Sequence, residues 1–338
     1  MTRSRRRSGF SLPAVLAVTG MVSLIFLVAM TALRSLTAEA ASARARVQFL
    51  AQALSLEASA TYMLATEPLS PTAVDLGGPR RYDDSVTSAV EDVDRVRLDG
   101  RSYRVDGSRP MVMEFRDQAG LVNLAYLSED ALFRLAGELG LDDRTARQLG
   151  ARYRDYIDQD DLAQSPGGEG SAYPDGRPPN RTMRTADEWL SLMGVREAVD
   201  ARAWRRLRPW LAMDTTSTNE NVNTAGPDAL RILYGATDSQ ISTALQQREE
   251  APFLSFQNFA AATGLPNTSG ESFYTFPSGR VVLTIKDTRS AWVYRSRLML
   301  DPTGLERPVW IDQTELTEAP GRAAADASDA PRLSYAPR

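Results

Sequence analysis

Residues 9–33 read GFSLPAVLAVTGMVSLIFLVAMTAL, and the uncharged run within them extends from Phe10 to Leu33. Its 24 residues are enough for a helix that crosses a bilayer, which takes ~20 predominantly apolar residues. The apolar region of a cleaved secretory signal is shorter, at ~7–15 residues. Four arginines precede the run and Arg34 follows it. We therefore expect residues 10–33 to form a single-pass helix with a cytoplasmic N-terminus.

The helical pattern continues beyond this run. No glycine or proline interrupts the chain between Met21 and Glu67. Apolar residues recur every three or four positions, at Leu36, Ala40, Ala43, Val47, Leu50, Leu54 and Ala58. We expect one helix from about Phe10 to about Leu64, with its first half in lipid and its second half against a globular domain.

The composition excludes several kinds of chemistry. The 338 residues include no cysteine and no histidine, so disulfides, thiolate or histidine metal sites and Ser-His-Asp triads are excluded. A metal would have to be held by oxygen atoms, which favours a hard cation such as calcium. The formal net charge is −4, and the arginines before Phe10 leave an acidic remainder. Nucleic acid is therefore not an expected partner.

Beyond the long helix, the periodicity predicts an α+β fold. Alternation predicts a strand at 93–98, followed by a hairpin signal at Asp99-Gly100. Strand character predicts further strands at 102–105, 111–116, 280–287, 291–300 and 309–312. Helical spacing predicts helices at 127–139, 142–157, 185–193, 196–207, 225–233, 238–249 and 255–263, with Ser128 as an N-cap. We expect an antiparallel helix-and-sheet domain at 34–116 and 275–317, an inserted all-α domain at 117–274 and a disordered tail at 318–338.

An acidic loop after the second of these helices is the best candidate for a ligand site. Its carboxylates are Asp155, Asp158, Asp160, Asp161 and Glu169, the last following a Gly-Gly turn. Calcium takes six to eight oxygen ligands and tolerates flexible loops, although the EF-hand spacing is missing here. The simpler alternative is a solvated acidic loop. A glycosidase pair is a third interpretation, but sequence spacing does not set the separation of carboxylates, and we expect no enzyme.

Residues 221–264 resemble a helix-hairpin-helix unit, which binds DNA phosphates through backbone N–H groups near a helix N-terminus. The hairpin would be Tyr234 to Thr237, with one glycine, and Asp238 begins the next helix. Because a carboxylate there repels phosphate, we expect a packing scaffold with Phe253, Phe256 and Phe259 in its core. A membrane-anchored DNA-binding protein remains an alternative.

The basic leader, the Gly9-Phe10-Ser11-Leu12 motif and the long apolar helix resemble type IV prepilins and type II secretion pseudopilins. This resemblance implies a leader at 1–9, cleavage after Gly9 by the prepilin peptidase and methylation of Phe10. The family usually has glutamate at the fifth mature residue, where this chain has Ala14. That departure is similar to minor pseudopilin K, the general secretion pathway protein K family.

Three later motifs resemble the same family: DQAGLVNL at 117–124, the acidic loop with Tyr156-Ile157-Asp158, Gly168-Glu169 and Tyr173, and NVNTA at 221–225. The family often has an acid directly after the glutamate, where this chain has Gly170. The resemblance implies a pilin-like fold with a helical insertion, and calcium in the acidic loop. It also implies a subunit in the inner membrane, with a periplasmic domain, that caps the pseudopilus of a type II secretion system. Expected partners are minor pseudopilins of types I and J, with secreted substrates as further candidates. A minor type IV pilin is the nearest alternative.

Overall fold

The computed structural model describes residues 11–76, 95–106, 109–173, 180–265, 274–287, 290–301, 308–318, 329–333 and 335. The expected leader, residues 1–9, and the expected first mature residue, Phe10, lie outside these residues. Contacts divide the chain into two units, Met1–Ser55 and Leu56–Arg338, which are described separately.

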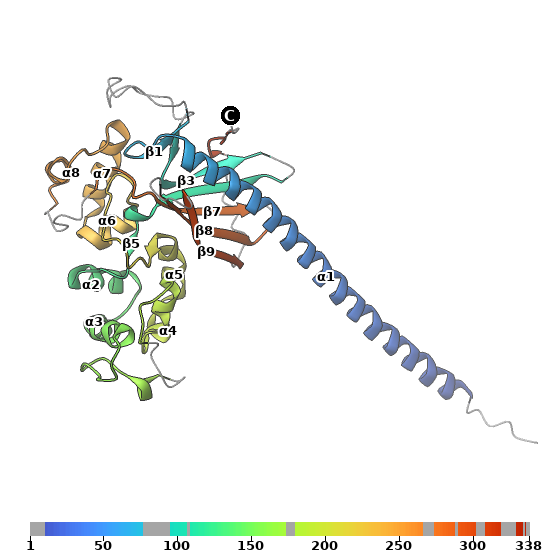
Figure 1. Ribbon diagram of the computed structural model, residues 1–338. Helices are drawn as coiled ribbons and strands as arrows, with labels where there is room; N and C mark the ends of the chain where they lie inside the picture. Colours follow the sequence, from blue (N-terminus) through green and yellow to red (C-terminus); the bar gives the residue numbers. More distant parts are fainter. Residues whose placement is uncertain are drawn as a thin grey trace, which may run out of the picture. The chain divides into compact units, whose positions relative to one another are not determined.

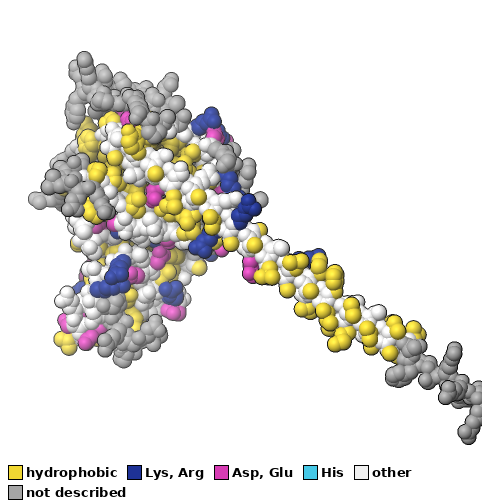
Figure 2. Space-filling view, turned by 45° about the vertical axis from the view of Figure 1, so that its right-hand side comes forward, with side chains coloured by type: hydrophobic (Ala, Val, Ile, Leu, Met, Phe, Trp, Pro, Cys, Tyr) yellow, Lys and Arg dark blue, Asp and Glu magenta, His cyan; other side chains and the backbone are white. Residues whose placement is uncertain are grey.

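A single helix, α1 (Ser11–Thr66), occupies the described part of the first unit, and its last turns belong to the second. The prediction of one continuous helix is confirmed. Among the described residues, α1 is the one helix long and apolar enough to cross a membrane. Figure 2 shows hydrophobic side chains along much of its visible face.

The second unit is built on a five-stranded antiparallel sheet in the order β3-β4-β7-β8-β9 (Figure 1). Its strands are β3 (Asp99–Val105), β4 (Met111–Asp117), β7 (Arg280–Asp287), β8 (Trp292–Leu300) and β9 (Val309–Glu318). Two short pairs accompany it: antiparallel β1 (Ala73–Asp75) with β2 (Arg95–Arg97), and parallel β5 (Val122–Asn123) with β6 (Leu211–Ala212).

The two faces of the sheet differ in polarity, because successive residues of a strand point to opposite sides. One row in register across all five strands is mostly apolar: Tyr103, Met113, Ile285, Tyr294 and Leu316. Tyr294 donates a hydrogen bond to Glu57, so this face lies toward the last turns of α1. The adjacent row is polar: Ser102, Glu114, Thr284, Arg295 and Glu315.

The helical region lies between β4 and β7 in sequence and beside the sheet in Figure 1. Its α-helices are α2 (Glu129–Glu138), α3 (Asp143–Ile157), α4 (Val195–Ala198), α5 (Ala201–Leu207), α6 (Pro227–Tyr234), α7 (Asp238–Glu250) and α8 (Phe256–Thr263). The described residues of this region also form 3-10 turns at η2 (Gln118–Gly120), η3 (Gly170–Ala172), η4 (Ala186–Ser191) and η5 (Arg208–Trp210). Their own core includes Leu135, Leu149, Trp189, Leu230 and Phe259.

Local predictions in this region were correct where a cap or a period was clear. Ser128 caps α2 by accepting from the Ala131 amide, as predicted. The helix expected at 196–207 is wrong in one respect, since it consists of two pieces, α4 and α5. Asp200 separates them, because its side chain accepts from the Ala203 amide and starts a new helix.

The hairpin expected at Asp99-Gly100 is also wrong. β2 pairs with β1, whereas Asp99 already begins β3, which pairs with β4. Gly100 has a φ of +87° at an irregularity in that pairing. The glycine therefore marks the point where the extended chain changes partner, since this φ favours glycine in a strand as well as in a turn.

The expected disordered tail differs from the structure in two places. β9 extends to Glu318, and residues 331–333 lie beside β3 through backbone hydrogen bonds with Arg104. Residues 331–333 pair with a strand that is more than 200 positions away in the sequence. Such a contact leaves no periodic pattern in the neighbouring residues, so the sequence predicted a disordered tail. Residues 319–328 lie outside the described part.

Candidate metal centre

The candidate site lies at the C-terminal end of α3 and in the loop that follows. Asp155 is in the last turn of α3, and Asp158 is the residue that caps it. A spacing of three residues places both on one side of the helix. Glu169 precedes η3 and is brought back to this helix end by the intervening loop.

Three carboxylates meet here. Asp155, Asp158 and Glu169 each offer an oxygen, and these oxygens lie within 4.8 Å of one another. The Asp155 side chain is fully buried, and both carboxylate oxygens of the half-buried Glu169 are buried as well. Buried carboxylates are rare unless they are paired or hold a metal, so this grouping needs a compensating partner.

Protein groups compensate only part of the cluster. The Gln164 amide donates to both Asp155 oxygens, at 3.1 and 3.0 Å. Within the described residues, Asp158 Oδ1 and both Glu169 oxygens are buried without a hydrogen-bond partner. A buried acceptor without a partner costs about 1–3 kcal/mol, and more when it is charged. The unused oxygens therefore form an acceptor set that a cation would satisfy.

Burial and the crowding of negative charge also shift the pKa values of these carboxyl groups. Burial raises the pKa of Asp158, and the negative charges of Asp160 and Asp155 raise it further. Burial also raises the pKa of Glu169, with the neighbouring aspartates acting in the same direction. The C-terminal end of α3 adds partial negative charge. A bound cation would lower the pKa values of Asp158 and Glu169.

The other two predicted residues lie outside the three-carboxylate cluster. Asp160 and Asp161 are exposed. Asp160 accepts from the Leu162 amide at 2.8 Å, while Asp161 accepts from the Asn180 side chain at 3.3 Å. Their charges reach Glu169, so they contribute to the local field without joining the buried group.

The turn before Glu169 has a specific steric role. A Cβ on Gly167 would lie 2.1 Å from Asp155 Oδ2, so the loop passes this carboxylate only because the residue is glycine. The oxygen-only donor set with a formal charge of −3 fits a hard cation such as calcium. The sequence pattern did not indicate the backbone donor at Gln164 or the steric requirement at Gly167.

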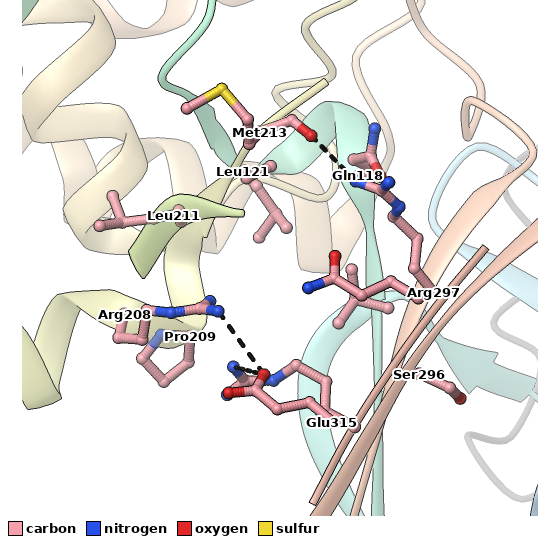
Figure 3. A pocket seen from close by; sticks show the side chains of 14 residues that line it. Gln118, Leu121, Arg208, Pro209, Leu211, Met213, Ser296, Arg297 and Glu315 are labelled. Carbon is pink, nitrogen blue, oxygen red and sulfur yellow. Dashed lines mark hydrogen bonds and ion pairs between the residues drawn. The ribbon is translucent and has the colours of Figure 1, made fainter. Parts of the chain in front are cut away.

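Apart from the carboxylate cluster, a cavity of about 40 Å³ lies between the helical region and the sheet (Figure 3). Its arginines are ion-paired: Arg208 with Asp187 and Glu315, Arg295 with Glu315, and Arg297 with Asp312. Arg297 also donates to the Met213 carbonyl at 2.9 Å, which ties β8 to the helical region. The volume suits a few water molecules, whereas ligand pockets have ~300–1,000 Å³.

In the helix-hairpin-helix segment, the backbone N–H of Thr237 in the hairpin already has an acceptor within the chain. The Thr237 hydroxyl accepts from the Gln240 amide at the start of α7, and the Gln240 side chain accepts from the Thr237 amide. Arg231 pairs with Asp238 at 2.6 Å. The three predicted core phenylalanines, Phe253, Phe256 and Phe259, are buried. The unit packs as the scaffold that the sequence predicted.

Comparisons with known proteins agree with this architecture. Residues 118–213, which contain the carboxylate cluster, match the family model of the first domain of protein K of the type II secretion system. The type II secretion system protein K of Dickeya chrysanthemi is 29% identical over 162 residues, covering 46% of this chain and 42% of that protein. This match therefore spans less than half of the relative.

A solved structure, the GspK-GspI-GspJ complex from the type 2 secretion system of enterotoxigenic Escherichia coli, has a similar fold. The matched chain gives a TM-score of 0.55 at 16% identity, over 83% of this chain and all of that one. Such identity supports the fold alone. Together with the family model over residues 118–213 and the sequence relative, it gives a consistent result: the chain is similar in sequence and in fold to protein K of the type II secretion system.

Proposed function

We propose that the chain acts as a minor pseudopilin of a type II secretion system. The observation that carries this proposal is α1, a single helix of 56 residues that is apolar enough to cross a membrane and whose last turns pack on a sheet. A membrane segment continuous with the helix of a globular domain suits a subunit that leaves the bilayer while keeping its helix intact.

The proposal includes maturation and orientation. The prepilin peptidase would cut after Gly9 and leave methylated Phe10 as the first residue. The leader arginines would keep the N-terminus in the cytoplasm, with the sheet and the helical region in the periplasm. The mature chain would then stay anchored in the inner membrane through the first half of α1.

We further propose a position at the tip of the pseudopilus, where the chain would help to begin assembly. Residues 118–279, between β4 and β7, add a helical region with its own core to the sheet. A repeating shaft position would have to accommodate that bulk in every neighbour, whereas a tip position would not. Ala14 in place of glutamate also fits a subunit without a preceding neighbour. The role is structural, without catalysis.

Calcium is the proposed ligand of the carboxylate cluster. Asp155, Asp158 and Glu169 would hold the ion, with Asp160 and Asp161 as outer charges that raise its local concentration. The ion would supply positive charge between the end of α3 and the Gly167 turn, fixing the loop against the helix. Its role is structural, because the site joins two segments of one region.

Complex formation tests the proposed function. The full chain would be co-expressed in a bacterial membrane with the type I and type J minor pseudopilins of the same system and purified in detergent. We expect the three to co-elute as one complex, like the proteins named in the solved GspK-GspI-GspJ structure. Types I and J eluting without this chain would contradict the proposal. Salt-dependent retention on DNA would favour the membrane-anchored DNA-binding alternative instead.

A further inference from the structure

One edge of the main sheet is covered by a distant part of the same chain. β3 is an edge strand, and edge strands present unpaired backbone groups that invite pairing. The Arg104 amide donates to the Pro331 carbonyl at 2.9 Å, and the Leu333 amide donates to the Arg104 carbonyl at 2.8 Å. Residues 331–333 therefore form a parallel β-bridge along the β3 edge, near the label C in Figure 1.

The side chains of this segment enter a groove between β3 and α1. Leu333 and Tyr335 line a cavity of about 80 Å³ together with Leu56, Ala60, Met63, Val105 and Met113. The Tyr335 ring lies 6.4 Å from the Tyr62 ring, and its hydroxyl is 3.3 Å from the Thr66 hydroxyl. The two half-buried residues are separated by one position, which is the spacing of one face of a strand.

Charge adds a third kind of contact. Arg332, on the opposite face from Leu333, forms an ion pair with Asp106 just beyond β3. Backbone pairing, alternate side chains in a pocket and one charged contact are the features of peptide recognition by β-strand addition.

The connection to this segment is compatible with a detachable ligand. Residues 319–328 read APGRAAADAS, without a large apolar side chain. They run from the end of β9, at one edge of the sheet, to β3 at the other. The distance from β9 to the segment beside β3 is about 24 Å for five strand spacings of ~4.8 Å. Ten residues reach at most ~33–36 Å, which exceeds this distance.

We propose that the groove between the β3 edge and the last turns of α1 is a peptide-binding site. Its ligand is an extended peptide with the pattern Arg-Leu-x-Tyr, supplied in the resting chain by its own residues 329–335. A short tether gives an effective concentration in the millimolar range, so the chain's own segment excludes competitors at micromolar concentration. The segment thereby keeps the β3 edge from pairing with other chains. The site is independent of the proposed secretion function.

Binding of the same peptide in trans tests this site. The probe is a fluorescent peptide of residues 329–338, and the protein is the full chain in detergent, compared with a variant lacking those residues. A full-length Leu333→Asp variant opens the groove without a deletion. The control peptide carries Arg332→Glu and Leu333→Asp. Hydrogen exchange of the Arg104 amide gives a second measurement.

We expect saturable binding to both opened variants, at least tenfold weaker binding of the control peptide and no binding to the wild-type chain at micromolar peptide. The Arg104 amide should exchange faster in the opened variants and regain protection with peptide. Absence of binding to the Leu333→Asp chain would overturn the proposal, even if the deletion variant fails to fold. Equal binding to the wild-type chain, or equal binding of the control peptide, would also overturn it.

Discussion

The Tyr294 hydroxyl donates a hydrogen bond of 2.9 Å to the Glu57 carboxylate, joining β8 to the last turns of α1. Glu57 is only 5% exposed, and burial followed by the hydrogen bond to Glu57 raises the pKa of Tyr294. The pair is thus a buried polar contact on an otherwise apolar sheet face, where it fixes the rotation of the helix.

A Tyr294→Phe change should destabilise the second unit by about 1.5–3 kcal/mol, because it leaves the Glu57 carboxylate buried without its donor. Urea unfolding of the full chain in detergent, followed by tryptophan fluorescence, measures the loss. Glu57→Gln is the matched control, since its amide oxygen still accepts from Tyr294. An equal loss in both variants would mean that the hydrogen bond itself does not carry the effect.

Asp117 is the last residue of β4, just before the helical region. Its carboxylate connects this point to Ser278, near the end of the region, and to Thr224 within it. Its carboxylate accepts from Ser278 Oγ at 2.7 Å, the Ser278 amide at 3.0 Å and Thr224 Oγ1 at 2.9 Å. Burial raises its pKa, while these hydrogen bonds act in the opposite direction. An Asp117→Asn change turns one acceptor into a donor that faces the Asn221 amide. We expect a loss of about 2–3 kcal/mol by urea unfolding.

The control for Asp117 is Asp312→Asn. Asp312 is exposed and pairs with Arg297 at 2.7 Å, and exposed ion pairs contribute about 0–1 kcal/mol. A smaller loss for Asp117→Asn than for Asp312→Asn would contradict the structural role of the junction.

Calcium should stabilise the chain through Glu169. At a free calcium concentration one hundred times its Kd, a single site adds about 2.7 kcal/mol to the free energy of unfolding. We expect the Tm to rise by several degrees over that in chelator. Glu169→Gln should abolish this rise, whereas Asp161→Asn should retain most of it because Asp161 lies outside the cluster. A wild-type Tm unaffected by calcium would remove the metal assignment.

The same residue gives a pH dependence whose sign can be worked out. Because the folded pKa of Glu169 is raised, the folded chain binds this proton more tightly than the unfolded chain does. Its contribution to stability is present below the ordinary value near 4.3 and is lost as pH rises through the raised value.

Glutamine mimics the protonated form of this group. In chelator, Glu169→Gln should therefore have a higher Tm than wild type at pH 7.5, and the difference should shrink toward pH 4.5. Thermal melts of both chains across this range measure it. A wild-type chain more stable than the variant in chelator at pH 7.5 would show that the carboxylate already has a compensating partner.

The sequence predicted those features that depend on neighbouring residues. The continuous helix followed from apolar spacing without breakers, and β7 was predicted with its observed bounds because residues 280–287, RVVLTIKD, have the composition of a strand. That β4 pairs with β7, on the far side of the helical region, depends on contacts that no local pattern encodes.

The site shows the same division. Asp155 and Asp158 could be expected on one side of α3 from their spacing. The arrival of Glu169, rather than Asp160 or Asp161, depends on a close backbone approach at Gly167, which only the folded loop specifies.

The mature N-terminus is the measurement that tests the central claim most directly. Intact-mass and peptide mass spectrometry of the chain extracted from its native membrane would identify the first residue. We predict a chain beginning with N-methylated Phe10, the product of cleavage after Gly9. A chain beginning at Met1, or one cut near Ala41, would make α1 an ordinary anchor or a removed signal and would contradict the pseudopilin function.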